Sequence, residues 1–198
     1  MPDKEPPIYG LVLIGGKSTR MNSDKALLSY RGRPHAAHCY DLLSNHCDRV
    51  YLSTRSDAPL KGSLEALNVV NDVTDVPGPM AGILAAFEEE SQAAWLVLAC
   101  DLPYVTDTTL ERLVAARDNE NFATVYASPE DRKPEPLCAI YEPRIRSILQ
   151  ESAANADYSP RNLLSRLDIS LLDAHDPRDL RNVNTPEEYV AALQELKK

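Results

Sequence analysis

Residues 11–25 have the sequence Leu-Val-Leu-Ile-Gly-Gly-Lys-Ser-Thr-Arg-Met-Asn-Ser-Asp-Lys, and the expected fold follows from this stretch. The apolar run from Ile8 to Ile14 is too short for a helix and is rich in β-branched residues, so it predicts a buried strand. Gly15 and Gly16 end this strand. Because glycine permits sharp turns and close backbone approach, the N–H groups that follow can converge on an anion.

Three basic residues follow the two glycines: Lys17, Arg20 and Lys25. They favour a phosphate-binding loop at the carboxyl end of the strand. The loop is not a Walker A motif, because the first glycine of that motif would fall at position 11, which is Leu. A dinucleotide-binding Gly-x-Gly-x-x-Gly motif is absent as well. An ordinary tight turn is the alternative interpretation of two adjacent glycines.

The stretch from Leu13 to Lys25 resembles the signature loop of the molybdenum cofactor guanylyltransferases, the MobA family. That loop follows the pattern Leu-Ala-Gly-Gly-x-Ser-x-Arg-Met-Gly-x-Asp-Lys. The present chain has Ile14 where the family usually has Ala, and Asn22 where it usually has Gly. Asn tolerates left-handed backbone better than most residues. Ile14 places a larger side chain where a nucleotide base would lie.

A second glycine-containing segment, Pro77-Gly78-Pro79-Met80-Ala81-Gly82, precedes a predicted helix. Gly82 lies inside that helix, where glycine costs about 1 kcal/mol relative to Ala. Close helix packing and close approach of a ligand are both possible reasons. The segment resembles the Gly-Pro-Leu-Ala-Gly segment that lines the nucleotide pocket of MobA proteins, and this resemblance implies nucleotide contacts at Gly78 and Gly82.

An acidic residue, Asp101, follows the apolar strand predicted over Trp95–Ala99. The carboxyl end of a central parallel strand is where open α/β sheets bind ligands. A helix cap or a turn is the alternative role for such an Asp. Cys100-Asp101-Leu102-Pro103 resembles the Cys-Asp-x-Pro motif of nucleotidyltransferases, which implies that Asp101 holds Mg²⁺. One carboxylate suffices when phosphate oxygens and water supply the other ligands.

The carboxyl end contains Asn182-Val183-Asn184-Thr185-Pro186, which resembles the Asn-Val-Asn-Thr-Pro motif of MobA proteins. In that family both Asn residues contact the pterin. We expect a short strand over Leu180–Val183. Two amides two residues apart on a strand share a face, where they can offer hydrogen-bond donors and acceptors to a polar heterocycle. Arg161 is a third candidate for pterin binding. Thr185 also begins a helix-capping sequence that by itself has no functional meaning.

The order of elements predicts an α/β fold. Strands and helices alternate through Ala127, which favours a Rossmann-like, doubly wound, mostly parallel sheet with helices on both faces. The carboxyl third should add one or two antiparallel strands within a single nucleotidyltransferase domain, residues 1–198. The other expected strands are Arg49–Thr54, Leu67–Asn71, Phe122–Ala127, Leu137–Tyr141 and Leu167–Leu172.

The composition and charge of the chain exclude several classes of function. The formal net charge of −9 argues against a sequence-independent nucleic-acid surface. The longest apolar stretch, Ala93–Cys100, is too short to cross a bilayer, and no signal peptide precedes Ile8, so we expect a cytoplasmic protein without membrane contact. The His and Cys residues of 35–47 are too widely spaced along one helix to share a zinc ion.

The resemblance implies a Mg²⁺-dependent enzyme that transfers GMP from GTP to the molybdopterin cofactor and releases pyrophosphate. Gly15 and Gly16 would cradle the nucleotide, and Arg20 and Lys25 would neutralise phosphate charge. Further binding positions are Leu13, Ile14 and Asp72. Family members usually have Asn near Ser53, so this chain departs from the pattern there.

Three alternatives remain. A molybdenum cofactor cytidylyltransferase has a similar loop but typically reads Ala-Ala-Gly, whereas Ile14-Gly15-Gly16 favours GTP. Sugar-phosphate nucleotidyltransferases more often carry Gly-x-Gly-Thr-x-Arg. A non-catalytic carrier would bind the cofactor and pass it to apo-molybdoenzymes. Such enzymes and other cofactor-biosynthesis proteins are the expected protein partners.

Overall fold

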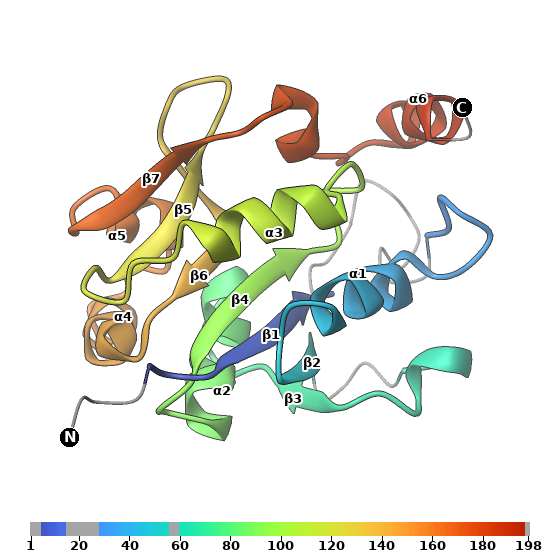
Figure 1. The fold of residues 1–198 in the computed structure, drawn as a ribbon. Coiled ribbons are helices and arrows are strands. Elements are labelled where there is room, and N and C mark those ends of the chain that lie inside the picture. Colours follow the sequence, from blue (N-terminus) through green and yellow to red (C-terminus); the bar gives the residue numbers. More distant parts are fainter. Residues whose placement is uncertain (1–4, 15–27, 56–59, 197–198) are drawn as a thin grey trace.

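The computed structural model describes residues 5–14, 28–55 and 60–196. Its centre is one sheet built from β1 (Ile8–Leu13), β2 (Arg49–Thr54), β3 (Val69–Asn71), β4 (Ala94–Ala99), β5 (Ala123–Ala127), β6 (Pro134–Tyr141) and β7 (Ile169–Asp173). The seven strands lie in the order β3-β2-β1-β4-β6-β5-β7 (Figure 1). All neighbouring strands pair in parallel except those next to β6, which is antiparallel to both β4 and β5.

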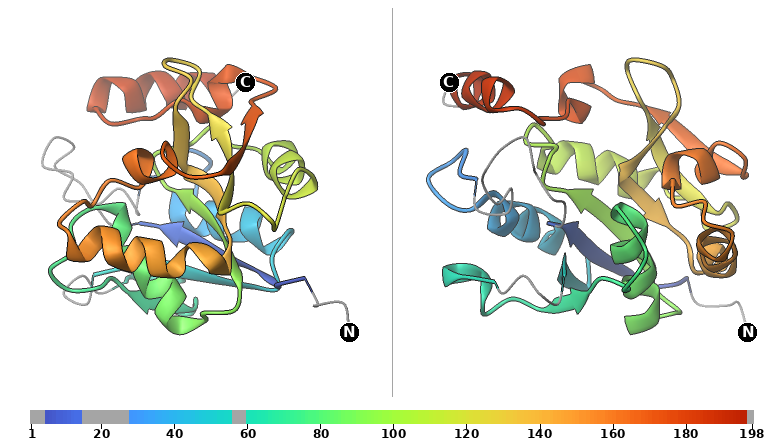
Figure 2. Two further views of the ribbon diagram at one scale, coloured as in Figure 1. Left: turned by 90° about the vertical axis from the view of Figure 1, so that its left-hand side faces the viewer. Right: turned by 180° about the vertical axis from the view of Figure 1, so that it is seen from behind.

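Helices cover both faces of this sheet. One face carries α1 (His35–Ser44) and α3 (Asp107–Ala115). The other carries α2 (Pro79–Glu89), α4 (Arg146–Ala154) and α5 (Pro160–Leu164), which lie in front when the molecule is seen from behind (Figure 2). Helix α6 (Pro186–Glu195) packs with Tyr30 and Tyr104 in a small separate cluster. The predicted α/β fold with a mostly parallel sheet is confirmed.

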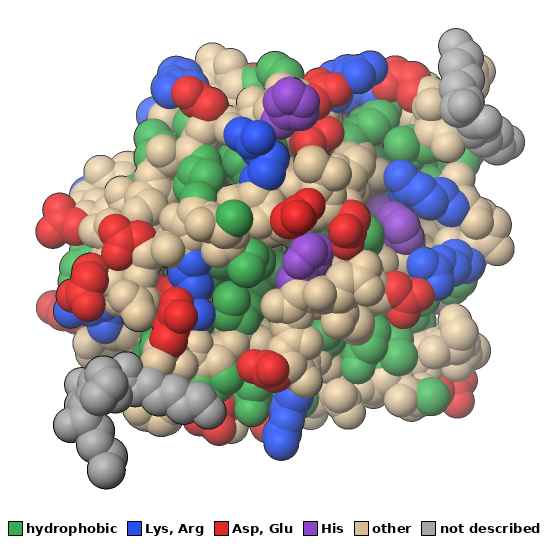
Figure 3. Space-filling model, viewed as in Figure 1, with side chains coloured by type: hydrophobic (Ala, Val, Ile, Leu, Met, Phe, Trp, Pro, Cys, Tyr) green, Lys and Arg blue, Asp and Glu red, His purple; other side chains and the backbone are tan. Residues whose placement is uncertain are grey.

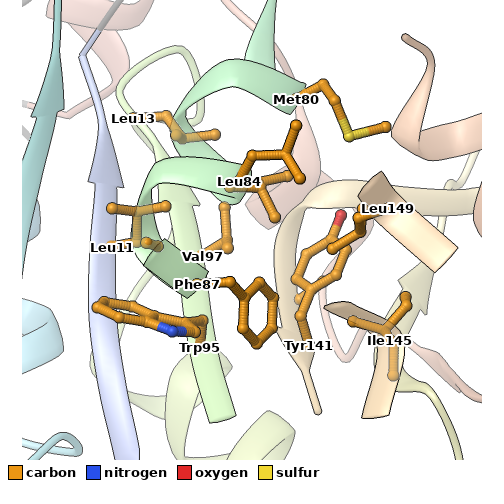
Figure 4. Close-up of a cluster of buried hydrophobic side chains, with 14 of the residues drawn as sticks. Leu11, Leu13, Met80, Leu84, Phe87, Trp95, Val97, Tyr141, Ile145 and Leu149 are labelled. Carbon is orange, nitrogen blue, oxygen red and sulfur yellow. The ribbon is translucent and has the colours of Figure 1, made fainter. Parts of the chain in front are cut away.

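The core consists of two apolar layers, one on each side of the sheet. In β1, Leu11 faces the α2 layer while Val12 faces the α1 layer. Figure 4 shows Phe87 of α2 between Trp95 of β4 and Tyr141 of β6. Because β4 is buried on both faces, its sequence is wholly apolar rather than alternating.

Local sequence signals explain where the helices begin. Helix α3 starts with a capping box in which Thr106 and Thr109 bond reciprocally, and α6 starts with the same arrangement between Thr185 and Glu188. Helix α2 begins with Pro79 after Gly78, whose φ of 70° is a conformation that favours glycine. Among the described residues, no helix is long and apolar enough to cross a membrane.

One predicted element is wrong. Leu180–Val183 does not form a strand: a short 3₁₀ helix covers Pro177–Leu180, and the chain then runs to α6 without joining the sheet. The Asp176 side chain accepts a hydrogen bond from the Arg178 N–H and Pro177 fixes the next φ, so this turn forms locally. The predicted antiparallel addition is confirmed by β6, which lies inside the sheet between β4 and β5.

Figure 3 shows acidic and basic side chains interspersed over the face that α1 and α3 cover. The net negative charge is therefore not gathered into a single patch on this face.

Candidate active site

The carboxyl ends of β1 and β4 lie side by side, and this adjacency organises the candidate site. Leu13 pairs with Ala99 in the parallel register, and the Cys100 N–H donates to the Leu13 carbonyl oxygen at 3.1 Å. Asp101 therefore lies at the same edge of the sheet as Ile14, the residue that precedes the glycine turn. The predicted positions Gly15, Gly16, Arg20 and Lys25 lie outside the described residues, so their roles stay predictions.

Beside β1, helix α2 approaches the sheet unusually closely at Gly82. A Cβ atom at this position would lie 2.2 Å from Oγ of Ser53 and 2.7 Å from Cδ2 of Leu13. Such distances are too short for non-bonded atoms, so only glycine fits without movement of its neighbours. Close packing accounts for this glycine, and contact with a ligand stays a prediction.

Ser53 and Asp72 are joined at the same edge. The Ser53 hydroxyl donates to the Asp72 carboxylate, and the Asp72 N–H donates to the Thr54 carbonyl oxygen at 2.8 Å. Partial burial raises the pKa of the Asp72 carboxyl, while the bond from Ser53 acts in the opposite direction. Leu13, Ser53, Asp72 and Gly82 thus form one compact group beside the end of β1.

The amino end of α2 completes this side of the site. Within the described ranges no side chain caps its first backbone N–H groups, and such groups together with the helix dipole favour a negative charge. A Cβ atom at Gly78 would contact none of the described residues within 4 Å. The glycine at this position is required by its positive φ rather than by crowding.

On the other side of Asp101 lies the segment Asn182–Asn184. The Val183 N–H donates to the Asp101 carbonyl oxygen at 2.8 Å, which holds the two segments together. Because this segment is not a strand, the expectation that the two Asn side chains share a strand face is wrong. Asn182 is half-buried, whereas Asn184 is exposed and its N–H donates to the Glu188 carboxylate at 2.6 Å.

Asn182 lines a cavity of about 570 Å³, which we call the acceptor cavity. The cavity lies between the start of α2, the first half of β6 and the start of α5. Its lining residues are Pro79, Glu135, Pro136, Leu137, Asp157, Tyr158, Ser159, Pro160, Arg161 and Asn182. The structure therefore brings Arg161 and Asn182 together, as the predicted site requires.

The electrostatic centre of the acceptor cavity is an ion pair. Arg161 Nη2 lies 2.8 Å from Glu135 Oε2, and Arg161 Nη1 lies 3.7 Å from Asp131 Oδ2. Burial is the main cause that raises the pKa of the Glu135 carboxyl. Sequence reasoning missed Glu135 because residues 128–136 have the composition of a loop, and it missed Tyr158 because residues 155–159 have the composition of a polar connection. The only signal was a Glu two residues before the apolar run 137–141.

Comparison with known proteins identifies the family of this chain. Residues 10–171 match the MobA-like NTP transferase domain. The chain belongs to this family. It is therefore a nucleotidyltransferase, and the predicted resemblance to the MobA family is confirmed.

Individual members of the family agree with this assignment. The chain is 38% identical over 183 residues to a molybdenum cofactor biosynthesis bifunctional protein of Synechocystis, covering 92% of this chain and 53% of that protein. The chain thus spans about half the length of that relative. It is 32% identical over 201 residues, covering both chains fully, to a molybdenum cofactor guanylyltransferase of Pseudomonas aeruginosa.

A solved structure shares the fold. The molybdopterin-guanine dinucleotide biosynthesis protein A of Archaeoglobus fulgidus superposes with a TM-score of 0.75 at 20% identity, covering 96% of this chain and 98% of that one. At this identity the likeness establishes the MobA-like fold and nothing finer.

Proposed function

We propose that this MobA-like nucleotidyltransferase joins GMP from GTP to the molybdopterin cofactor and releases pyrophosphate. Asp101 carries the proposal by its position. The Leu13–Cys100 bond connects it to the group formed by Ser53, Asp72 and Gly82, and the Val183–Asp101 bond connects it to the acceptor cavity. A carboxylate between two ligand regions is what transfer of a nucleotidyl group requires. Relatives named as guanylyltransferases support GTP as the donor.

The reaction forms one bond and breaks one. An oxygen of the acceptor's terminal phosphate attacks the α-phosphorus of GTP, and the bond from that phosphorus to the oxygen bridging to the β-phosphate breaks. Pyrophosphate leaves with the electron pair. No general base is needed, because a phosphate monoester is largely ionised at neutral pH, its second pKa being about 6. Positioning and charge neutralisation then provide most of the catalysis.

The residues present fit a magnesium ion. Asp101 offers hard oxygen ligands at the edge where the phosphates would lie, and Mg²⁺ usually takes only one or two carboxylates. No three His, Cys, Asp or Glu side chains gather into a metal site within the described part of the chain. Asp101 would therefore hold a metal whose other ligands are phosphate oxygens and water. When bound, the ion neutralises developing charge on the triphosphate.

Each segment then has a stated role. Leu13, Ile14, Asp72 and Gly78 would border the nucleotide, with the triphosphate held by Gly15 and Gly16. Arg20 and Lys25 would neutralise its charge. Arg161, Asn182 and Asn184 would bind the pterin. The product would pass to apo-molybdoenzymes.

The test is incubation of the protein with Mg²⁺, molybdenum cofactor and GTP, CTP or ATP, with pyrophosphate and the dinucleotide both quantified. We expect product with GTP only, and none without Mg²⁺. Preference for CTP would identify a cytidylyltransferase instead. Binding of GTP and cofactor without any product would identify a carrier.

A further inference from the structure

Glu135 is a buried carboxylate that the reaction as described does not use. Its exposed fraction is 3%, and it lies near the start of β6. Its Oε1 accepts from the Leu137 N–H at 3.0 Å and its Oε2 accepts from Arg161 at 2.8 Å. A carboxylate has about four acceptor positions, so these two bonds leave others for a ligand.

The surroundings of Glu135 have the chemistry of a site for a flat heterocycle. Tyr158 and Leu137 provide aromatic and apolar walls, and Asn182 provides an amide. The Asn182 Oδ1 atom is buried and accepts no hydrogen bond from any residue that the structure describes. A buried acceptor left without a donor costs about 1–3 kcal/mol, which a ligand N–H would recover. The cavity volume of about 570 Å³ is of the size that small-molecule sites have.

A purely structural role for Glu135 would be to hold Arg161. Pairing with Arg161 explains the hydrogen bond to one carboxylate oxygen, but it does not explain why the carboxylate is buried. Arg161 already has a second partner in Asp131, at 3.7 Å on the rim, where both side chains are partly exposed. Burial of Glu135 is costly if its only purpose is to pair with a half-exposed cation. The burial is reasonable if the carboxylate also meets donors of a bound ligand.

We propose that Glu135 recognises the pterin ring of the acceptor by accepting hydrogen bonds from its N3–H and its 2-amino group. This inference rests on the proposed function, because the pterin is the acceptor in that reaction. Arg161 keeps the carboxylate ionised and oriented, and Asn182 accepts from a further N–H of the ligand. Glu135 is thus the residue that determines specificity for the heterocycle.

This recognition selects against a ring that has an oxo group in place of the amino group. Lumazine differs from pterin in this way, and its 2-oxo group would face the Glu135 carboxylate, acceptor against acceptor. Sites that hydrogen-bond a specific donor reject analogues lacking it strongly, because buried polar groups are left unpaired.

The experiment is a fluorescence titration of the whole protein with free pterin and with free lumazine, in the presence of Mg·GTP. For wild type we expect pterin to bind at least tenfold more tightly than lumazine. The E135Q variant replaces one acceptor oxygen by a donor, so we expect this preference to disappear. The matched control is D131N, which removes the other carboxylate partner of Arg161 and should keep the preference.

Structural damage is separated from recognition by two further measurements. Thermal unfolding reports whether E135Q is folded. In the complete reaction, E135Q should raise KM for the molybdenum cofactor at least tenfold while KM for GTP stays unchanged. Wild type that fails to bind pterin, or that binds both rings equally, would overturn the proposal. So would an E135Q variant that keeps the preference.

Failure of this inference and failure of the proposed function are distinguishable. If wild type forms the dinucleotide from GTP but does not discriminate pterin from lumazine, only the role of Glu135 is wrong. If wild type discriminates the two rings but forms no product with any nucleotide, the proposed pterin site is supported and the proposed reaction is wrong.

Discussion

The backbone N–H of Val183 donates to the carbonyl oxygen of Asp101 at 2.8 Å, although the two residues are far apart in the sequence. This bond holds the segment that contains Asn182, which lines the acceptor cavity, beside the end of β4. A segment outside the sheet is thereby held against the residue that follows β4.

The first prediction concerns Asp101 itself. Replacement by Asn keeps the shape of the side chain but removes its charge, so we expect pyrophosphate release to fall by at least about 10²-fold. The melting temperature should change little. The control is Asp173→Asn, at the exposed end of β7. Activity of D101N equal to wild type would contradict the assignment of this residue to the metal.

The second prediction concerns the close packing at Gly82. Gly82→Ala forces a Cβ atom against Ser53 and Leu13, so we expect a loss of about 1–3 kcal/mol in the free energy of unfolding. Ser53→Ala alone removes the hydroxyl that bonds to Asp72, at a cost of about 0.5–1.5 kcal/mol. The double variant should lose less than the sum, because the nearest clashing atom is gone.

Urea denaturation of the wild type, the two single variants and the double variant measures the coupling between positions 53 and 82. Strict additivity would mean that α2 shifts away from the sheet to relieve the clash instead.

The third prediction concerns a buried ion pair far from the site. Arg117 bonds to Glu142 through two nitrogens at 2.7 and 2.8 Å, and Glu142 is 1% exposed. Arg117→Ala leaves this carboxylate buried without its cation, so we expect a loss of about 3–5 kcal/mol in stability. The matched control is Arg166→Ala, which breaks an exposed pair with Asp157 and should cost about 0–1 kcal/mol. Similar losses in both variants would show that Glu142 finds another partner.

The fourth prediction concerns His38 on α1. Burial, aided by the nearby charges of Arg31, His35 and Arg33, lowers the pKa of His38 to about 4, with Asp41 acting in the opposite direction. The Nδ1 atom of His38 lies 3.3 Å from Arg33 Nη2, which fits a neutral ring accepting a hydrogen bond. We expect the NMR signal of this ring to titrate near pH 4.

The sign of the effect on stability follows from this depressed pKa. Folding favours the neutral ring, so the contribution of His38 is complete above its unfolded pKa of about 6.5. It is lost as the pH falls from there toward 4. His38→Gln should therefore flatten the pH dependence of the urea midpoint in this range. Equal slopes in wild type and H38Q would refute the assignment.

Much of this fold could be predicted because its signals are local. The apolar strands before Gly15 and before Asp101, and the capped helices after Thr106 and Thr185, depend on neighbouring residues only. Because strands and helices alternate along this part of the chain, the sequence also predicts the parallel half of the sheet. Gly82 could be singled out in its helix, but its contact with Ser53 is a tertiary feature that no local pattern contains.

The acceptor side was harder to predict because it depends on distant pairing. Residues 134–136 have the composition of a loop, yet they begin β6 because the distant strand β5 supplies partners there, with Glu135 opposite Tyr126 and Pro134 opposite Ala127. This pairing is what buries Glu135. Asn182 lines the cavity, and its pterin contact stays a prediction, but its predicted backbone conformation is wrong, since Pro177 and the Asp176 cap favour a turn over a strand.

The internal position of β6 has a consequence for biosynthesis. As the nascent chain leaves the ribosome, β1 to β4 can assemble as soon as residue 99 has emerged, but the outer edge of β4 stays unpaired until Tyr141 follows. That edge belongs to the most apolar strand of the molecule, and bare apolar edges invite aggregation. We expect polypeptides truncated between these two points to be insoluble. In the complete protein, pairing of β6 with β4 should cover this edge and prevent aggregation.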